Sequence, residues 1–325
     1  MKSRVPYIHG VRNQASSFSA SHPLLTFTFL SLAFSSLFFY RAFLGDSYSG
    51  ASNLFNDSLY RSATPEGWRF LTIRDHTIYW QFLPWDLFAA RSLRQGEIPL
   101  WNPYNGTGAP FLANWQSTVF SPLKIPLYLV PSVKMFDLLL LVKVFLGSLF
   151  AFLFAYYYPS PLGGEGRGKG KFIASTVAGL SFGFGGSIIS SLRLFEINTF
   201  ILSPLLFLSV HRLSRSPSAS NAAWVSLATA LLLLSGHPEA TAYTLLGGAV
   251  YGAVFILADT RGALVILRKG LLLLLAFSGG ALISSVALLP FLEFLLFEGS
   301  TYRTLTSPET LPLWHYLLRF TGLLL

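Results

Sequence analysis

Residues 24–44 read LLTFTFLSLAFSSLFFYRAFL, and this apolar stretch indicates the solvent in which the chain folds. A helix needs about 20 apolar residues to cross a hydrocarbon core, so the stretch predicts a first transmembrane helix. A cleaved signal peptide is the alternative, because the stretch follows a tail with three basic residues, Lys2, Arg4 and Arg12. Arg41 interrupts the end of the stretch without a small-residue cleavage site, which favours an uncleaved anchor after a cytoplasmic tail at residues 1–23.

Further apolar runs fill the rest of the chain. They lie at about 135–157, 172–191, 197–210, 222–235, 240–258 and 270–292, and a last one begins near Trp314. The whole chain is 52% hydrophobic and only 11% charged, unlike a soluble domain. The predicted fold is therefore all-α: a polytopic transmembrane helix bundle over residues 132–325, with some short runs as buried or broken helices. Because the sequence stops inside an apolar run, we expect a piece of a longer protein.

The charges predict how the chain is oriented. The net charge of +9 raises the possibility of nucleic-acid binding, but the basic residues lie in short segments between apolar runs, where they set topology. Alternating the runs places the tail and the loops 159–171, 211–221 and 259–269 on one side, predicted to be the cytoplasm, with 159–171 as a flexible glycine-rich loop. The acidic residues gather on the other side. This assignment of sides requires that the proline-rich segment 119–131 lies at the membrane interface or enters and leaves the membrane on the same side.

Residues 45–131 are predicted to form a long first extracytoplasmic loop. A loop of this length serves a function more often than it merely connects. Pro84 and Gly96 predict the start and the end of a helix within it. One side of this helix carries apolar residues and the other Arg91 and Arg94, as expected of a helix lying in the membrane interface. We expect the loop to roof the bundle.

The segment WNPYNGTGAPFLANWQ, residues 101–116, mixes aromatic rings, side-chain amides and turn glycines. Sugars suit such mixtures, because their C–H faces stack on rings and their hydroxyls pair with amides. An aromatic belt with ordinary turns at the membrane boundary is an equally good interpretation. The candidate sugar-binding residues are Trp101, Asn102, Asn114 and Gln116, with Gln81 before them.

Asp75 is the acid that we single out. A carboxylate held between the lipid surface and the protein is able to take a proton from an acceptor hydroxyl as a general base. The competing interpretation is that Asp75 caps a short helix over residues 78–83. Asp46 and Asp86 are secondary candidates, and the alternative for both is a solvated charge at the interface.

Three ionisable residues elsewhere are candidates for substrate binding. Glu196 begins an apolar run, and His237 and Glu239 lie in a Gly-His-Pro-Glu turn between two predicted helices. Ionisable groups at membrane depth are costly unless they face a cavity or a partner. A His-x-Glu pair alone is a weak indication of a metal, so no metal site is predicted. The chain has no cysteine, which excludes disulfides and thiolate chemistry.

Several of these motifs together resemble the YfhO-like family of bacterial membrane proteins. The first is Asp75-x5-Gln81-x2-Pro84-Trp85, and it is long and specific. The others are GEIPLWNPY at 96–104, G-x-P-x2-A-N-x-Q at 108–116, Ser-Pro at 121–122, the glycine-rich segment 179–186, GHPE at 236–239 and PFLE at 290–293. The resemblance covers nearly all of the chain beyond its tail. By position and context, the glycines of 179–186 are predicted to serve close helix packing rather than to cradle a phosphate.

This family is placed in the GT-C superfamily of integral membrane glycosyltransferases. The resemblance implies a sugar donor linked to polyprenyl phosphate, an envelope glycan or polymer as the acceptor, and inversion at the anomeric carbon. Asp75 matches the general-base position, and Arg74, Arg91 or Arg94 is able to pair with the phosphate. No cofactor is implied. The expected location is the bacterial cytoplasmic membrane with the N-terminus in the cytoplasm, although family members are usually much longer than this chain.

Two other functions remain open from the sequence. A transporter or flippase of lipid-linked glycans would use buried polar groups within the bundle rather than a base on a loop. A membrane scaffold that keeps the fold without catalysis is the third possibility.

Overall fold

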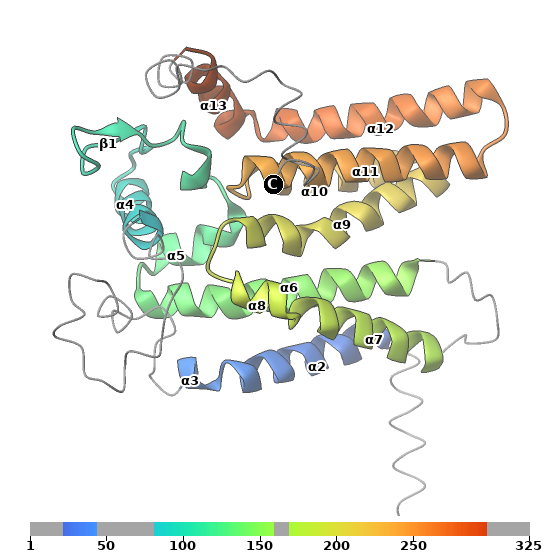
Figure 1. Ribbon diagram of the computed structural model, residues 1–325, viewed down its shortest axis with the longest axis horizontal. Coiled ribbons are helices and arrows are strands. Elements are labelled where there is room, and N and C mark those ends of the chain that lie inside the picture. Colours follow the sequence, from blue (N-terminus) through green and yellow to red (C-terminus); the bar gives the residue numbers. More distant parts are fainter. Residues whose placement is uncertain (1–21, 44–80, 159–168, 298–325) are drawn as a thin grey trace, which may run out of the picture.

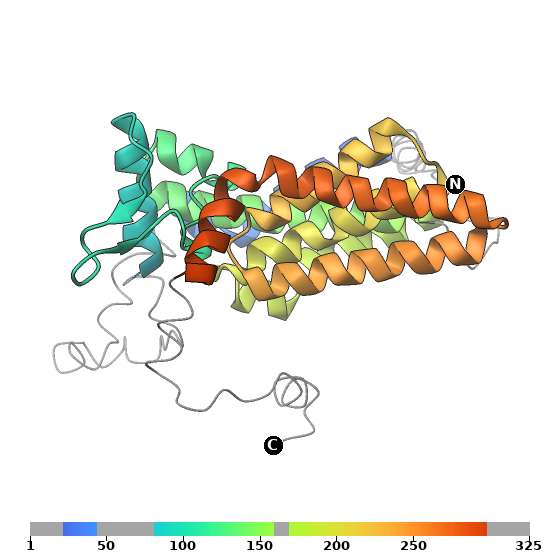
Figure 2. The same ribbon diagram turned by 90° about the horizontal axis from the view of Figure 1, so that it is seen from above.

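The computed structural model describes residues 22–43, 81–158 and 169–297. The described chain is a bundle of helices that run side by side (Figures 1 and 2). The segments long and apolar enough to cross a membrane are formed by α6 (Val133–Tyr157), α7 (Lys169–Gly183) with α8 (Gly186–Ser190), α9 (Glu196–Arg215), α11 (Pro238–Asp259) and α12 (Ala263–Ile283). Shorter apolar helices are α2 (Pro23–Phe38), α10 (Ala219–Leu233) and α13 (Ser285–Phe297). The prediction of an all-α membrane bundle is therefore confirmed.

Several predicted boundaries are wrong at the end of the bundle away from α4. Helix α9 continues through Arg215, α7 begins at Lys169 and α12 begins at Ala263, so most of the predicted loops 211–221 and 259–269 is helical. The apolar pattern stops short of these ends because long cationic side chains on a terminal turn reach toward the aqueous layer. Helix ends therefore carry the basic residues Lys169, Lys171, Arg212, Arg215, Arg268 and Lys269.

Two predicted helices are interrupted. The run at 172–191 divides into α7 and α8, and the run at 270–292 divides into α12 and α13 at Ser284. The hydroxyl of Ser284 donates to the carbonyl of Gly280 at 3.0 Å, a local bond that commonly bends a helix. The first span is also divided: α2 is followed, after Phe39, by the short helix α3 (Tyr40–Phe43).

Helix α9 lies at the centre of the bundle. In its most apolar window 78% of the residues are buried, against 17% for α12. Its fully buried Ile197, Ile201 and Leu206 belong to the main hydrophobic core. Enclosure by neighbouring helices explains why α9 tolerates buried polar residues that a lipid-facing helix avoids. Among the predicted packing glycines, Gly179 and Gly183 confirm the expectation, because a Cβ at either would collide with α6.

Residues 81–131 form what we call the cap. It comprises α4 (Leu83–Arg94), the antiparallel pair β1 (Trp101–Asn102) and β2 (Ala109–Pro110), the short helices η5 (Trp115–Ser117) and η6 (Pro122–Lys124), and α5 (Ile125–Leu129). Helix α4 lies across one end of the bundle, transverse to the long helices (Figures 1 and 2). Within the cap no helix has the length of a span, so 119–131 does not cross as a helix.

Candidate functional site

Helix α4 brings an acid into the interior. The predicted apolar face is present: Ala89 is fully buried, and the ring of Phe88 packs edge-on against Phe111 at a centroid distance of 5.0 Å. Pro84 lies in the first turn, and Gly96 follows the helix with a φ of +80°, as the sequence predicts. The adjoining face turns Asp86 toward the bundle, where it is only 3% exposed. The interpretation of Asp86 as a solvated interface charge is therefore wrong.

Lys124, the last residue of η6, is the direct partner of Asp86. Its ammonium donates to Oδ1 of Asp86 and, at 3.2 Å, to the carbonyl of Ser117. The same ammonium lies 5.5 Å from the ring centroid of Phe195, within the range of a cation–π interaction. This buried ion pair joins the two ends of the cap, because its partners are 38 residues apart in the chain.

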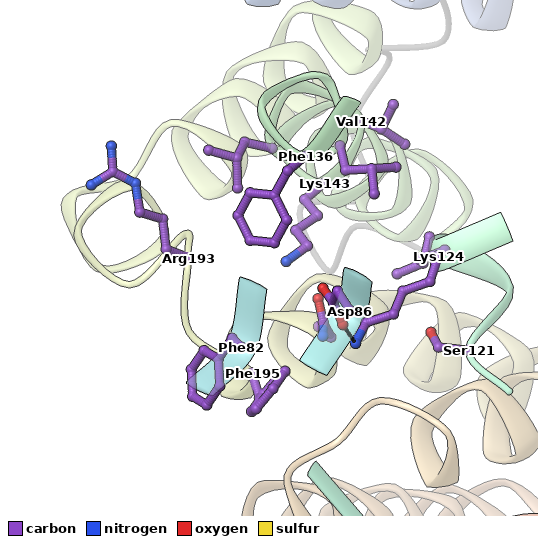
Figure 3. Close-up of a pocket in the computed structure, with 13 residues that line it drawn as sticks. Phe82, Asp86, Ser121, Lys124, Phe136, Val142, Lys143, Arg193 and Phe195 are labelled. Atoms are coloured by element: carbon purple, nitrogen blue, oxygen red, sulfur yellow. Dashed lines mark hydrogen bonds and ion pairs between the residues drawn. The ribbon is translucent and has the colours of Figure 1, made fainter. Parts of the chain in front are cut away.

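A second lysine reaches the same place from the bundle. Lys143 lies on α6, and its ammonium points toward Asp86 in Figure 3. We call Asp86, Lys124 and Lys143 the charged cluster. With both lysines and the carboxylate ionised, the cluster carries one excess positive charge. Such a charge inside a protein is costly unless an anion or a polar partner balances it.

The charged cluster borders a small, partly open cavity. Its volume is about 30 Å³, the space of roughly one water molecule. Phe82, Phe136 and Phe195 contribute aromatic walls, and Asn198 lines it from the first turn of α9. The Nδ2 of Asn198 donates to the carbonyl of Ser235 at 3.0 Å, while its Oδ1 has no hydrogen-bond partner in the described part of the chain.

Burial dominates the electrostatics of the cap residues. It raises the pKa of the Asp86 carboxyl, and the positive charges of Lys124 and Lys143 act in the opposite direction. Burial, together with the negative charge of Asp86, also raises the pKa of Tyr128 on α5. The Tyr128 hydroxyl therefore keeps its proton and donates to the carbonyl of Thr118 at 3.4 Å.

Glu196 and His237 are brought together on the other side of the first turn of α9. Oε2 of Glu196 lies 3.9 Å from Nε2 of His237. The Nδ1 of His237 accepts from the backbone N–H of Ala240 at 3.0 Å and so caps α11. In the neutral ring the proton is therefore on Nε2, facing Glu196. Glu239 lies in the first turn of α11, where it complements the helix dipole. The described residues hold no group of three or more potential metal ligands.

The predicted sugar-binding amides have structural roles in the cap. Oδ1 of Asn102 accepts from the N–H of Tyr104 at 3.0 Å, and Oδ1 of Asn114 accepts from the N–H of Gln116 at 3.1 Å. The side chains of Gln81 and Gln116 meet in a hydrogen bond of 3.4 Å. The fold thus brings Gln81 and Gln116 together, whereas Asn102 and Asn114 shape turns.

The aromatic and basic candidates lie outward. Trp101 is 53% exposed and Tyr104 is 77% exposed, so both rings are available at the surface. Arg91 and Arg94 are also exposed, in the last turn of α4. Asp75, Asp46 and Arg74 lie outside the described residues.

Sequence reasoning missed both lysines of the charged cluster. Lys143 interrupts an apolar run, and an ionisable residue inside a predicted span is a site candidate by default. Lys124 carried no such indication, because a lysine in a proline-rich loop is ordinary. None of the family models, curated proteins and solved structures compared with this chain matches it.

Proposed function

We propose that the chain is an integral membrane glycosyltransferase. It transfers a sugar from a polyprenyl-phosphate-linked donor to an envelope glycan on the outer face of the bacterial cytoplasmic membrane. The observation that carries the proposal is the cap, which gathers exposed rings, paired amides and a buried charged cluster at one end of the bundle. The motif that resembles YfhO-like proteins of the GT-C superfamily leads into this cap and runs through it.

The distribution of charge supports an outward-facing cap. The ends of α7, α9 and α12 away from the cap carry Lys171, Arg212, Arg215, Arg268 and Lys269 (Figure 1). Arg261 lies in the turn between α11 and α12 at the same end. Basic residues collect on the cytoplasmic side of membrane proteins. The cap then meets the head group of a lipid-linked donor at the outer interface.

The proposed reaction is a single displacement. The acceptor hydroxyl oxygen attacks the anomeric carbon, and the bond from that carbon to the phosphate oxygen breaks. The electron pair leaves with the lipid phosphate, and the hydroxyl proton passes to a carboxylate base. The resemblance gives this role to Asp75. Attack opposite the leaving group inverts the anomeric centre.

Replacement of Asp75 by Asn tests the proposal. Without a base the transfer rate is expected to fall by about 100-fold or more, the usual contribution of general-base catalysis. The measurement is transfer of a labelled sugar from the lipid-linked donor by the full chain in proteoliposomes. Glu97→Gln is the control, because Glu97 is an exposed acid of the cap. Transfer by Asp75→Asn at the rate of the unchanged protein would exclude Asp75 as the base.

A transporter or flippase of lipid-linked glycans is the second candidate. The interruptions between α7 and α8 and between α12 and α13 favour it, since broken helices line substrate paths in many transporters. Buried polar contacts within the bundle, such as Tyr251 with His211 at 3.1 Å, point the same way. Movement of labelled donor across a vesicle membrane without bond cleavage would support this function over sugar transfer.

A further inference from the structure

Lys143 is a cation on a membrane-spanning helix, and the acid that it faces already accepts a hydrogen bond from another lysine. It lies within the apolar span 134–157 and points toward Asp86, which accepts a hydrogen bond from Lys124. In the described residues the ammonium of Lys143 makes no hydrogen bond or ion pair of its own. Packing alone does not require a lysine here, because an apolar side chain of similar volume would avoid the cost of burying the charge.

The surroundings of Lys143 suit an anion. Helix α9, 20 residues long, directs its N-terminal turn at the same cavity through Phe195 and Asn198. The N-terminus of a helix carries a partial positive charge and free N–H groups, and both attract oxyanions. The charged cluster, with its excess positive charge, and the N-terminus of α9 therefore both favour binding of an anion.

Asn198 provides an independent indication of a ligand. It is 5% exposed and lines the cavity, and its Oδ1 has no partner among the described residues. A buried amide oxygen without a donor is unfavourable and calls for a hydroxyl or a water. A sugar linked to phosphate offers both features, because anionic oxygens match the lysines and a hydroxyl matches Asn198.

We propose that Lys124 and Lys143 bind the phosphate group of the lipid-linked donor, and that Asp86 competes with this phosphate for the two lysines. The anion site stands on the geometry of the charged cluster. The choice of a lipid-linked phosphate over a free one rests on the proposed function.

Competition by Asp86 follows from its position. Its carboxylate accepts a hydrogen bond from Lys124, and the ammonium of Lys143 points toward the same carboxylate. A phosphate that binds both lysines would therefore take the place of the carboxylate at Lys124. Removal of the negative charge at Asp86 should then strengthen binding, whereas removal of either lysine should weaken it. If the ion pair had only a structural role, the protein would not bind the phosphate, and the acid and lysine variants would not change its affinity in opposite directions.

Binding to the full chain in zwitterionic nanodiscs tests the site by titration calorimetry. The probe is a short-chain polyprenyl phosphate, with the matching polyprenol and inorganic phosphate as comparison ligands. Lys143→Gln is expected to weaken binding of the lipid phosphate by about tenfold or more, as for loss of a hydrogen bond to a charged group. Asp86→Asn is expected to strengthen it. Lys134→Gln, an exposed lysine on the same helix, is the control that leaves binding unchanged.

The comparison ligands identify the source of the phosphate. Preference for the lipid phosphate over inorganic phosphate supports a lipid-linked ligand, and equal binding of the two supports an anion site for free phosphate. Equal binding of polyprenol and polyprenyl phosphate, or unchanged binding in Lys143→Gln, would overturn the anion site. If Asp86→Asn does not fold, Lys143→Gln still tests the anion site. This substitution breaks no hydrogen bond or ion pair among the described residues. This experiment measures binding and not sugar transfer. A negative result would overturn the anion site, whereas the glycosyltransferase proposal is tested separately by Asp75→Asn.

Discussion

Lys124 holds the cap together through a pair that is almost wholly buried. Replacement of Lys124 by Gln leaves the Asp86 carboxyl buried without the cation that is hydrogen-bonded to it. We expect a loss of about 3 kcal/mol in the free energy of unfolding, typical of breaking a buried pair on one side only. The double variant Lys124→Gln with Asp86→Asn should lose less than the sum of the single changes. Unfolding in mixed micelles measures these values, and additive losses would show that the two residues do not interact.

The pH dependence of phosphate binding follows from Asp86. Its carboxyl faces Lys124 from η6, Lys143 from α6 and Tyr128 from α5, and burial raises its pKa above the ordinary value. Protonation at falling pH neutralises the carboxylate and releases the lysines, so affinity for the phosphate should rise as the pH is lowered.

A phosphodiester lipid is the suitable probe for this measurement, because its single charge does not titrate in the range of interest. The affinity is measured at pH values from about 7 to about 5, a range in which an Asp carboxyl with a raised pKa takes up its proton. Asp86→Asn should remove the slope. A flat profile in the unchanged protein, or the same slope in the variant, would contradict the competing role of Asp86.

The turn between α10 and α11 packs closely against the cap at Gly236. This glycine has a φ of +99°, and a Cβ added to it would lie 2.3 Å from Cγ2 of Thr118 in the cap. Gly236→Ala therefore combines backbone strain with a collision, and we expect it to cost about 2 to 4 kcal/mol of stability.

Gly262 provides the matched control for this substitution. It has a similar φ of +105°, but a Cβ added to it would meet no described atom within 4 Å. Gly262→Ala should cost only the backbone strain, about 1 kcal/mol. The difference between the two variants in a thermal unfolding experiment measures the cap contact. Equal losses of stability in the two variants would mean that the cap does not pack closely against Gly236.

Helix α4 shows what the sequence predicts and what it does not. Pro84, Gly96 and the apolar spacing predicted the helix and its two faces, because these are local signals. The burial of Asp86 was not predictable in this way, since it depends on Lys124 and Phe195, which only the tertiary fold brings near. The pairing of Glu196 with His237 likewise joins the ends of two helices 41 positions apart in the chain.

The molecule as a whole is polarised. One end carries the cap with its mixture of acids and bases, and the other carries basic residues on helix ends, with Asp259 paired to Arg215 at 3.4 Å. The hydropathy pattern predicted the spans well, because burial in lipid demands long apolar helices. The ends and breaks of the helices escaped prediction, since bonds such as that of Ser284 depend on local geometry.

The location of the cap outside the cytoplasm is the claim on which a lipid-linked donor depends. The chain has no cysteine, so Thr107→Cys places a single thiol on the exposed tip of the cap, and Ser220→Cys places one at the opposite end. Labelling of intact cells with a membrane-impermeant maleimide measures which thiol faces outward. We predict that the Thr107→Cys variant is labelled in intact cells and the Ser220→Cys variant only after lysis. The reverse pattern would place the cap in the cytoplasm, out of reach of an outward-facing donor, and would contradict the proposed function.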